Sequence, residues 1–317
     1  MSHEKKITGA ASIVGAATAL SRVLGYIRDA AIAYVFGAGL FADAFFMAFR
    51  ISNLLRRLVG EGALTSSFIP IFTEEKGERS KEETRRLASS IFTLFALILA
   101  VLTVLGIVFS REIIGFMASG FAADPAKFEI TVTLTRLMFP YMVFIGLMAI
   151  AMGVLNSYKH FAAPAIAPVF LNLSLIACVF VLAPYLDLPV YALAVGVLIG
   201  GALQFAIQVP YLNRYGMLPY PSFRFRESAI KKIFILMGPA TIGIGVNQLN
   251  NFISLWFSSH LQEGAVSYLY YAGRLMELPL GVFGVAIGTA VLPSLSEHAA
   301  GKDWDGFRKS LSFAVRL

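Results

Sequence analysis

The sequence predicts an all-α polytopic membrane protein, on three observations. Its 317 residues are 57% hydrophobic and only 14% charged, whereas soluble domains carry about 25% charged residues. Several apolar runs exceed the roughly 18 residues that a helix needs to cross the hydrocarbon core. None of these runs alternates with a two-residue period, so we expect helices and not the strands of a membrane barrel.

Hydropathy along the chain predicts eight membrane-spanning helices and the start of a ninth. The polar segment Met1–Lys6 has no signal-peptide cleavage site after it, so we expect the first helix to be retained. The single cysteine, Cys178, excludes an intrachain disulfide. The predicted spans cover 7–37, 42–69, 87–110, 128–155, 163–184, 189–212, 229–258 and 265–294, and the ninth begins near 308.

The distribution of Lys and Arg predicts a cytoplasmic N-terminus. With that orientation the inner segments hold sixteen basic residues, whereas the outer loops hold only Arg111 and Lys127. Cytoplasmic loops of membrane proteins carry such an excess. Topology therefore explains most of the net charge of +7, and no nucleic-acid partner is expected.

The chain resembles itself at an offset of about 224 residues. An offset of six spans keeps the orientation of both copies, so we predict a parallel repeat about an axis along the membrane normal. Convergent apolar composition is the alternative explanation. The repeat predicts one complete six-helix lobe at 1–228 and the first part of a second at 229–317, and hence a fragment of a longer protein. The matches are AFRI with AGRL (48–51, 272–275), SFIPIFTE with AVLPSLSE (67–74, 290–297) and RRLASS with RKSLSF (85–90, 308–313).

Charged residues lie within the first two predicted spans, where a charge costs at least about 2.5 kcal/mol at the bilayer centre. Arg22 and Asp29 are seven residues apart, which places them on one helix face. Asp43, Arg50 and Arg57 repeat that spacing. The charges within spans that we consider are the cations Arg22, Arg28, Arg50, Arg56, Arg57 and Arg274 and the acids Asp29, Asp43, Glu61 and Glu277.

Two interpretations of these charges remain open. They could be salt bridges that hold helices together, and Arg274 with Glu277, three residues apart, fits a local pair. However, arginines outnumber acids in the first two spans, and unpaired cations at this depth need water or an anionic ligand. Arginine suits bidentate contact with phosphate. A water-filled cationic cavity for a phosphate or pyrophosphate anion is the second interpretation.

Motifs for other chemistry are missing from the sequence. It contains no GxxxxGK[ST] loop for ATP and no HExxH, and its four histidines lack metal-ligand spacing. We therefore expect no enzyme, no metal site and no cofactor on this chain. Asn172-Leu173-Ser174 matches a glycosylation pattern, but it lies in an apolar run and is interpreted as a chance match.

Several segments together resemble the MurJ (MviN) lipid II flippases. They are SRVLGYIRD, FGAGLFADAFFMAFR, NLLRRL, GEGAL and YYAGRLMELPLGVFGVAIGTAVLPSLS. The resemblance runs over essentially the whole chain. It implies a fold of fourteen helices, with two six-helix lobes around a central cationic cavity. It also implies movement of the undecaprenyl-pyrophosphate-linked peptidoglycan precursor from the inner to the outer leaflet by alternating access.

The resemblance implies a set of substrate-binding residues. These would be Arg22, Arg28, Arg56 and Arg274 with the acid Asp43, while Asp29, Arg50, Arg57, Glu61 and Glu277 would have supporting roles. Ser52, Gly60 and Gly273 depart from the family pattern, and Gly273 leaves Arg274 with one fewer local acid. None of these departures removes a charge of the set.

The resemblance also sets expectations about location, partners and energetics. We expect a multi-pass protein of the bacterial inner membrane that contacts membrane lipids. Cell-wall synthesis proteins are a second class of candidate partner. Because the cell interior is negative, outward movement of an anion is favourable, so we expect the membrane potential to contribute to transport; the sequence leaves open whether a cation is also coupled. Alternatives are a flippase for another lipid-linked polysaccharide precursor, a multidrug-type exporter of the same superfamily and a non-transport scaffold for cell-wall enzymes. The arginine excess disfavours an exporter of cationic drugs.

Overall fold

The computed structural model describes residues 3–56, 63–279, 291, 294–299 and 301–316. Helices dominate these ranges, and the described residues contain no strand. The chain divides into two compact units, Met1–Ser267 and Tyr268–Leu317. The first compact unit thus includes the seventh predicted span as well as the first six. The division at 228/229 follows from the repeat and stays a prediction.

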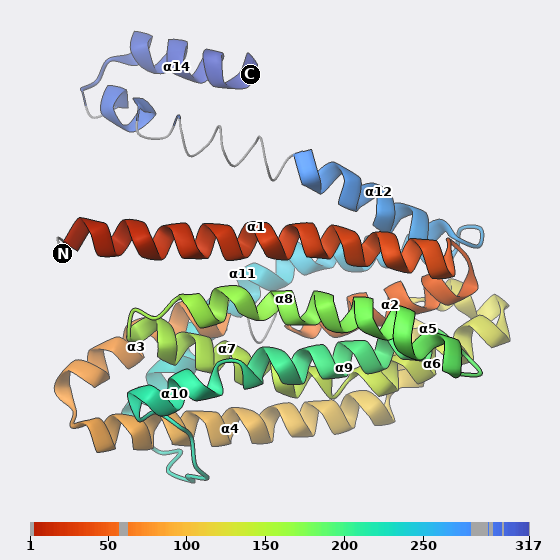
Figure 1. The fold of residues 1–317 in the computed structure, drawn as a ribbon, viewed down its shortest axis with the longest axis horizontal. Helices are drawn as coiled ribbons and strands as arrows, with labels where there is room; N and C mark the ends of the chain where they lie inside the picture. Colours follow the sequence, from red (N-terminus) through yellow and green to blue (C-terminus); the bar gives the residue numbers. More distant parts are fainter. Residues whose placement is uncertain (1–2, 57–62, 280–290, 292–293, 300, 317) are drawn as a thin grey trace. The chain divides into compact units, whose positions relative to one another are not determined.

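The first unit is a layered bundle of long helices (Figure 1). Helix α1 lies along α8, α8 packs on α9, and α7 contacts α3, α4 and α9. The helices are α1 (His3–Phe36), α2 (Leu40–Arg56), α3 (Ala63–Glu78), α4 (Lys81–Val108), α5 (Ser110–Met117), α6 (Pro125–Met138), α7 (Tyr141–Ser157), α8 (Ala162–Ala177), α9 (Tyr191–Ala206), α10 (Val209–Tyr215) and α11 (Ser228–Ser259), with short turns η2 (Ser119–Ala123), η3 (Cys178–Leu182) and η4 (Ala183–Tyr185).

Five helical segments of the described residues are long and apolar enough to cross a membrane, which makes this a multi-pass membrane protein. They correspond to the third to seventh predicted spans, and they are Lys81–Val108, Pro125–Ser157, Ala162–Tyr185, Tyr191–Tyr215 and Ser228–Ser259. The first predicted span lies almost wholly within α1, and it carries three charged residues, Arg22, Arg28 and Asp29. The second and eighth include positions outside the described residues. The six-helix lobe therefore stays a prediction.

Prolines divide two of the predicted spans into shorter helices. Pro140 separates α6 from α7, and Pro210 lies in the first turn of α10, directly after the break that follows α9. Proline lacks a backbone N–H and clashes with the preceding turn, so it ends or kinks a helix. The fourth span also begins earlier than predicted. Asp124 caps α6 through the backbone N–H groups of Ala126 and Lys127, so Lys127 lies in a helix and not in an outer loop.

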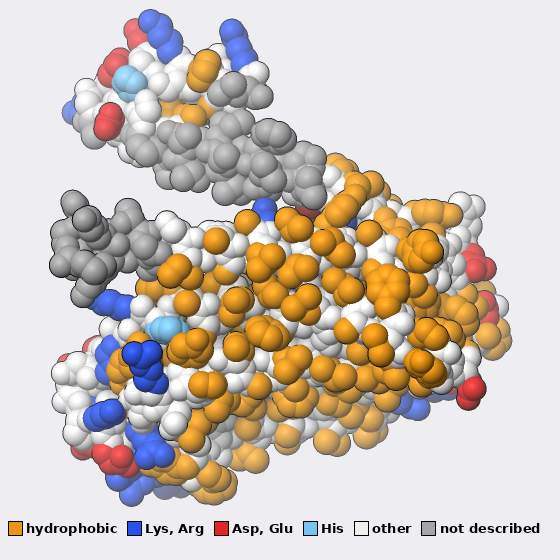
Figure 2. Space-filling view, viewed as in Figure 1, with side chains coloured by type: hydrophobic (Ala, Val, Ile, Leu, Met, Phe, Trp, Pro, Cys, Tyr) orange, Lys and Arg blue, Asp and Glu red, His pale blue; other side chains and the backbone are white. Residues whose placement is uncertain are grey.

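Small residues allow close packing inside the first unit. A Cβ atom on Gly200 of α9 would lie 2.8 Å from the Cα of Leu171 on α8, so only glycine allows this approach. Outside, apolar side chains cover the flank of the unit, and Lys and Arg gather at the end where α3 meets α4 (Figure 2). This distribution is typical of a lipid-facing surface that ends at a polar interface.

The second unit contains most of α12 (Ala265–Pro279) and α14 (Trp304–Arg316). Helix α14 carries exposed Trp304, Leu311 and Phe313 as well as Arg308 and Lys309. It covers the predicted start of the ninth span, whose continuation stays a prediction.

Candidate functional site

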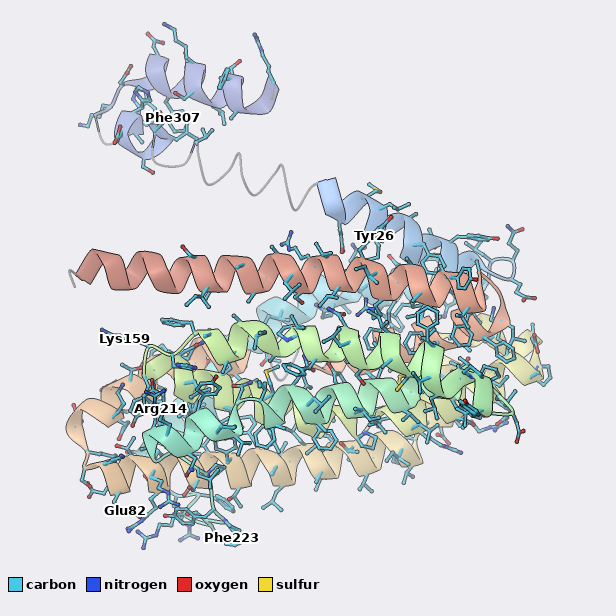
Figure 3. All side chains as sticks on the ribbon, viewed as in Figure 1. Tyr26, Glu82, Lys159, Arg214, Phe223 and Phe307 are labelled. Carbon is cyan, nitrogen blue, oxygen red and sulfur yellow. The ribbon has the colours of Figure 1, made fainter. Side chains whose placement is uncertain are left out.

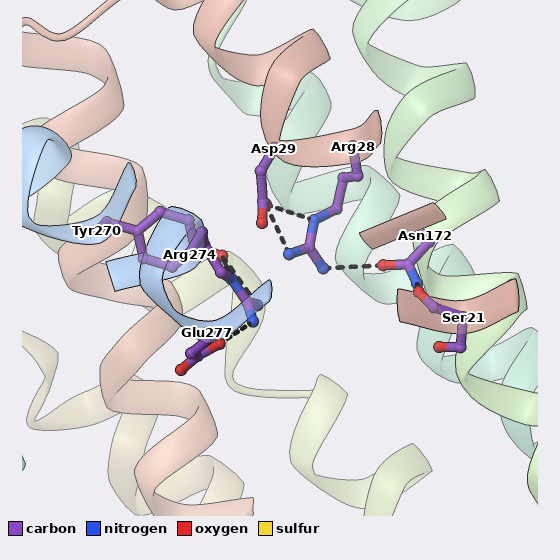
Figure 4. Close-up of polar contacts among 7 residues, drawn as sticks. All are labelled: Ser21, Arg28, Asp29, Asn172, Tyr270, Arg274 and Glu277. Atoms are coloured by element: carbon purple, nitrogen blue, oxygen red, sulfur yellow. Dashed lines mark hydrogen bonds and ion pairs between the residues drawn. The ribbon is translucent and has the colours of Figure 1, made fainter. Parts of the chain in front are cut away.

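Arg28 and Asp29 form a buried ion pair in the second half of α1. Both residues are 5% exposed. The guanidinium donates to Asp29 Oδ1 through Nε at 2.9 Å and through Nη2 at 2.6 Å. Its Nη1 donates to Asn172 Oδ1 on α8 at 3.0 Å, and Asn172 Nδ2 donates to the carbonyl of Ser21 at 3.0 Å (Figure 4). We call these four residues, Ser21, Arg28, Asp29 and Asn172, the Arg28 cluster.

The Arg28 cluster fixes a cation at the contact between α1 and α8. The planar fork of arginine reaches a carboxylate on its own helix and an amide on the neighbouring helix at once, which the point charge of lysine cannot do. The two helices are close beside Gly25, where a Cβ would lie 3.7 Å from Asn172 Nδ2, in ordinary van der Waals contact. Asp29 is therefore the partner of Arg28, not of Arg22, although Arg22 shares its helix face.

The other arginines predicted for the first two spans are placed differently. Arg22 is exposed on α1 and makes no hydrogen bond or ion pair with any residue that the structure describes. Arg50 is half-buried on α2. Arg56 ends α2, and its side chain lies outside the described part of the structure. Arg57 and Glu61 also lie outside the described residues. The substrate-binding roles of these residues stay predictions.

In the second unit, Arg274 and Glu277 form the predicted local ion pair. Arg274 Nη1 lies 2.9 Å from Glu277 Oε2. The guanidinium also lies over the ring of Tyr270, 5.4 Å from its centroid, and contacts the Tyr270 hydroxyl (Figure 4). The pair is solvent-accessible, with side chains 39% and 67% exposed. A pair this exposed contributes little to stability.

Asp43 lies in the first turn of α2 and, unlike the exposed Arg274–Glu277 pair, is fully buried. Its Oδ2 accepts from Lys127 Nζ at 2.6 Å and from the backbone N–H of Gly264 at 2.8 Å. Its Oδ1 accepts from the backbone N–H of Ser267 at 2.9 Å and from the Ser267 hydroxyl at 2.6 Å. The Lys127 ammonium also lies 4.2 Å from the centroid of the Phe121 ring. We call Asp43, Lys127, Gly264 and Ser267 the Asp43 cluster.

Two carboxylates, Asp43 of this cluster and the nearby Glu263, cap two helix ends. Asp43 satisfies N–H groups at the start of α12, and Glu263 Oε1 accepts from the N–H of Leu40, the first residue of α2, at 2.9 Å. Acidic groups are favourable at helix N-termini. The bonds of Asp43 with Ser267 and of Glu263 with Leu40 join positions 224 and 223 residues apart. This separation matches the predicted repeat offset of about 224 residues, and the repeat itself stays a prediction.

Sequence reasoning missed Lys127, Asn172, Glu263 and Ser267. The distribution of basic residues predicts Lys127 in an outer loop, although Asp124-Pro125 before it is a typical helix start that indicates a first turn. Asn172 was a lone amide in an apolar run, and such a residue usually needs a buried partner. Among the described residues, no group of three or more His, Cys, Asp or Glu side chains is placed to hold a metal ion.

The family model described as "Lipid II flippase MurJ" matches residues 32–317 of the chain. The chain belongs to the MurJ family. A lipid II flippase MurJ of Burkholderia cenocepacia is 44% identical over 304 residues, which are 95% of this chain and 59% of that protein. A probable lipid II flippase MurJ of Vibrio cholerae is 38% identical over 320 residues, covering 99% of this chain and 61% of that protein.

Solved structures agree with the MurJ assignment. A lipid II flippase MurJ in an inward closed conformation matches with a TM-score of 0.76 and 30% identity, over 95% of this chain and 61% of that one. A multidrug resistance MATE family transporter of the MOP superfamily, in an inward-facing conformation, matches with a TM-score of 0.69 at 16% identity, which indicates a shared fold alone. The chain thus spans about three fifths of the length of the curated MurJ relatives it matches.

Proposed function

We propose that this protein is a lipid II flippase, which moves an undecaprenyl-pyrophosphate-linked peptidoglycan precursor from the inner to the outer leaflet of the bacterial inner membrane. The observation that carries the proposal is the match to the MurJ family over residues 32–317. The arginines of α1 support it, because a pyrophosphate needs cations in a low-dielectric region. Arg28 is buried there and Arg22 has no protein partner among the described residues.

We assign the two clusters different parts in transport. The Arg28 cluster holds a guanidinium in place, because the ion pair with Asp29 and the hydrogen bond to Asn172 offset the cost of its desolvation. The Asp43 cluster joins α2, α6 and the start of α12 at the end of the bundle that the basic-residue distribution predicts to be extracellular. Alternating access requires that this end open, so these bonds would break when the substrate leaves outward.

Replacement of the resident flippase tests the proposed function. The complete gene is introduced into a bacterium depleted of its own lipid II flippase, and growth and the lipid II in the outer leaflet are measured. We expect both to be restored. Failure to restore growth, with the protein present in the membrane at a normal level, would contradict the proposal. It would then favour a flippase for another lipid-linked precursor.

The membrane potential provides a second test of the proposal. The cell interior is negative, so outward movement of an anion is favourable by about 2.3 kcal/mol per charge at 100 mV. The same potential favours the inward return of an empty cationic cavity. We expect an ionophore that dissipates the potential to slow flipping, and replacement of sodium in the medium to reveal whether a cation is also coupled. Flipping at an unchanged rate after ionophore treatment would contradict a role for the potential.

A further inference from the structure

A basic pocket lies at the end of the first unit where α3 gives way to α4. It is open and has a volume of about 430 Å³, which is within the range of roughly 300–1,000 Å³ that small-molecule sites occupy. Its charged lining consists of Lys76, Arg79, Lys81 and Arg214, and none of its lining residues is acidic. These residues come from α3, the α3–α4 turn, α4 and α10. The pocket is thus formed by the tertiary structure and not by a local run of charge.

Three of the four cations have no carboxylate partner among the described residues. Arg79 is paired with Glu75 and Glu227, each at 2.6 Å. By contrast, Lys81 and Arg214 are exposed, and neither forms an ion pair with any carboxylate in the described ranges. The pocket therefore has an uncompensated positive charge, and a monovalent or divalent anion would be attracted to it.

The third uncompensated cation, Lys76, is held in place by the protein. Its ammonium donates to the carbonyl of Ser157 and lies 4.4 Å from the centroid of the Tyr158 ring. Burial, and then the nearby Lys159 ammonium, lower the pKa of Lys76. An anion in the pocket would oppose both effects, because it would stabilise the charged form. Lys159 and Arg214 lie at the same end of the unit as Glu82 in the first turn of α4 (Figure 3).

Tyrosine rings and a glycine form part of the walls of the pocket and its surroundings. Tyr158 and Tyr215 stack with their ring centroids 4.9 Å apart and form an aromatic side wall. Gly216 ends α10 with a φ of +73°, and a Cβ there would lie 2.7 Å from the Cε atom of Lys81. A glycine at this position therefore satisfies the left-handed backbone and also leaves room for the Lys81 side chain.

The pocket lies at the level expected for lipid headgroups. Three apolar spans have an end at its rim, at Lys81, Ser157 and Tyr215. Tyrosine is enriched at membrane–water interfaces, and Tyr158, Tyr211 and Tyr215 cluster here with His160, whose ring stacks on Tyr211 at 4.5 Å. Basic pockets between helices on the cytoplasmic side are suited to phosphate-bearing headgroups.

We propose that this pocket binds the phosphate of an anionic phospholipid headgroup from the leaflet that faces the cytoplasm. Lys81 and Arg214 supply the contacts that depend on charge, Lys76 supplies a fixed donor, and the tyrosines pack against the glycerol. The site is separate from the Arg28 cluster, and the proposal does not depend on what the protein transports.

Lipid binding to the purified protein in neutral detergent tests the proposal. Binding is followed by native mass spectrometry with phosphatidylglycerol, zwitterionic phosphatidylcholine and soluble glycerol 3-phosphate. We expect the wild type to bind phosphatidylglycerol in preference to phosphatidylcholine. The double variant Lys81→Gln with Arg214→Gln should weaken the binding of phosphatidylglycerol at least 10-fold, about 1.4 kcal/mol. Displacement of the lipid by glycerol 3-phosphate would show that the headgroup phosphate is the group recognised.

Matched variants separate a built pocket from general surface charge. Arg224 and Arg226 are exposed in the loop before α11, outside the pocket, so Arg224→Gln with Arg226→Gln removes the same charge and should change binding less than 2-fold. Lys81→Arg with Arg214→Lys keeps the charge and should retain binding, which controls for misfolding. Equal effects of the two glutamine pairs, or equal binding of both lipids by the wild type, would overturn the proposal.

Discussion

Asp29 and Asp43 are both buried carboxylates near the start of the chain, yet their surroundings differ. Asp29 is paired with the residue next to it, Arg28, and the pair is joined to one further helix through Asn172. Asp43 receives four hydrogen bonds from α6, from the loop before α12 and from α12 itself. The first arrangement places a cation within the bundle, whereas the second joins separate helices. Their variants should therefore affect different properties.

The largest effect on stability should come from removing the Asp43 carboxylate. In Asp43→Ala, Lys127 stays buried without its partner, and N–H groups of Gly264 and Ser267 lose their acceptor. Breaking a buried ion pair in this way costs about 3–5 kcal/mol. Thermal unfolding in detergent should show a clear fall in Tm.

A solvent-exposed ion pair on α6, the helix that carries Lys127, is the control for Asp43. Glu129 of α6 pairs with Arg111 at 2.6 Å, but the two side chains are 52% and 57% exposed. Glu129→Gln should cost less than about 1 kcal/mol. If Asp43→Ala were no more harmful than Glu129→Gln, the Asp43 cluster would not be a structural connection between helices.

Variants of Arg22 and Arg28 should separate function from stability. Arg28→Ala leaves Asp29 buried without its cation, which we expect to cost about 3 kcal/mol, and Arg28→Ala with Asp29→Ala should recover most of that stability. Arg22 makes no bond with a described residue, so Arg22→Ala should leave the Tm unchanged. If both arginines contact substrate, Arg22→Ala and the double variant should each abolish growth of a flippase-depleted strain at normal membrane abundance.

The growth assay also distinguishes the alternative role of Arg28. Restored growth in the double variant would mean that Arg28 serves only to hold α1 against α8. Arg28→Lys adds a further comparison, because it keeps the charge but loses the fork that reaches Asp29 and Asn172 together. We expect it to support growth poorly.

A smaller effect is expected at Asn172, the residue that connects the Arg28 cluster to α8. Asn172→Leu removes the acceptor of Arg28 Nη1 and the donor to the Ser21 carbonyl. Leaving a buried group unsatisfied costs about 1–3 kcal/mol. Thermal unfolding is the measurement, and Asn213→Leu, at an exposed position of α10, is the control. A Tm equal to that of the control would show that the amide is dispensable.

The smallest effect belongs to Glu263, which supplements the Asp43 cluster from an exposed position. Glu263→Ala removes the acceptor for the N–H of Leu40, and loss of a helix cap costs roughly 0.5–2 kcal/mol. Because Asp43 still connects the same elements, we expect a change at the lower end of this range. A loss as large as that of Asp43→Ala would reverse the ranking of the two carboxylates.

The sequence by itself determined the membrane class, the helical architecture and the positions of most spans, because long apolar runs have few other stable forms. It also determined the Arg274–Glu277 pair, since residues three apart on a helix are neighbours whatever surrounds them. It identified Arg28, Asp29 and Asp43 as unusual, because each is a charge in an apolar run.

Only the tertiary structure decided which partners these charges have. Asn172 is 144 residues from Arg28, and Lys127 is 84 residues from Asp43. Helical spacing predicts that Asp29 lies on the face of Arg22, but it does not specify how the flexible Arg28 side chain folds back or where α8 packs. Ionic and hydrogen-bond partners far apart in the chain depend on how helices pack, and packing is set by the shapes of many apolar side chains together.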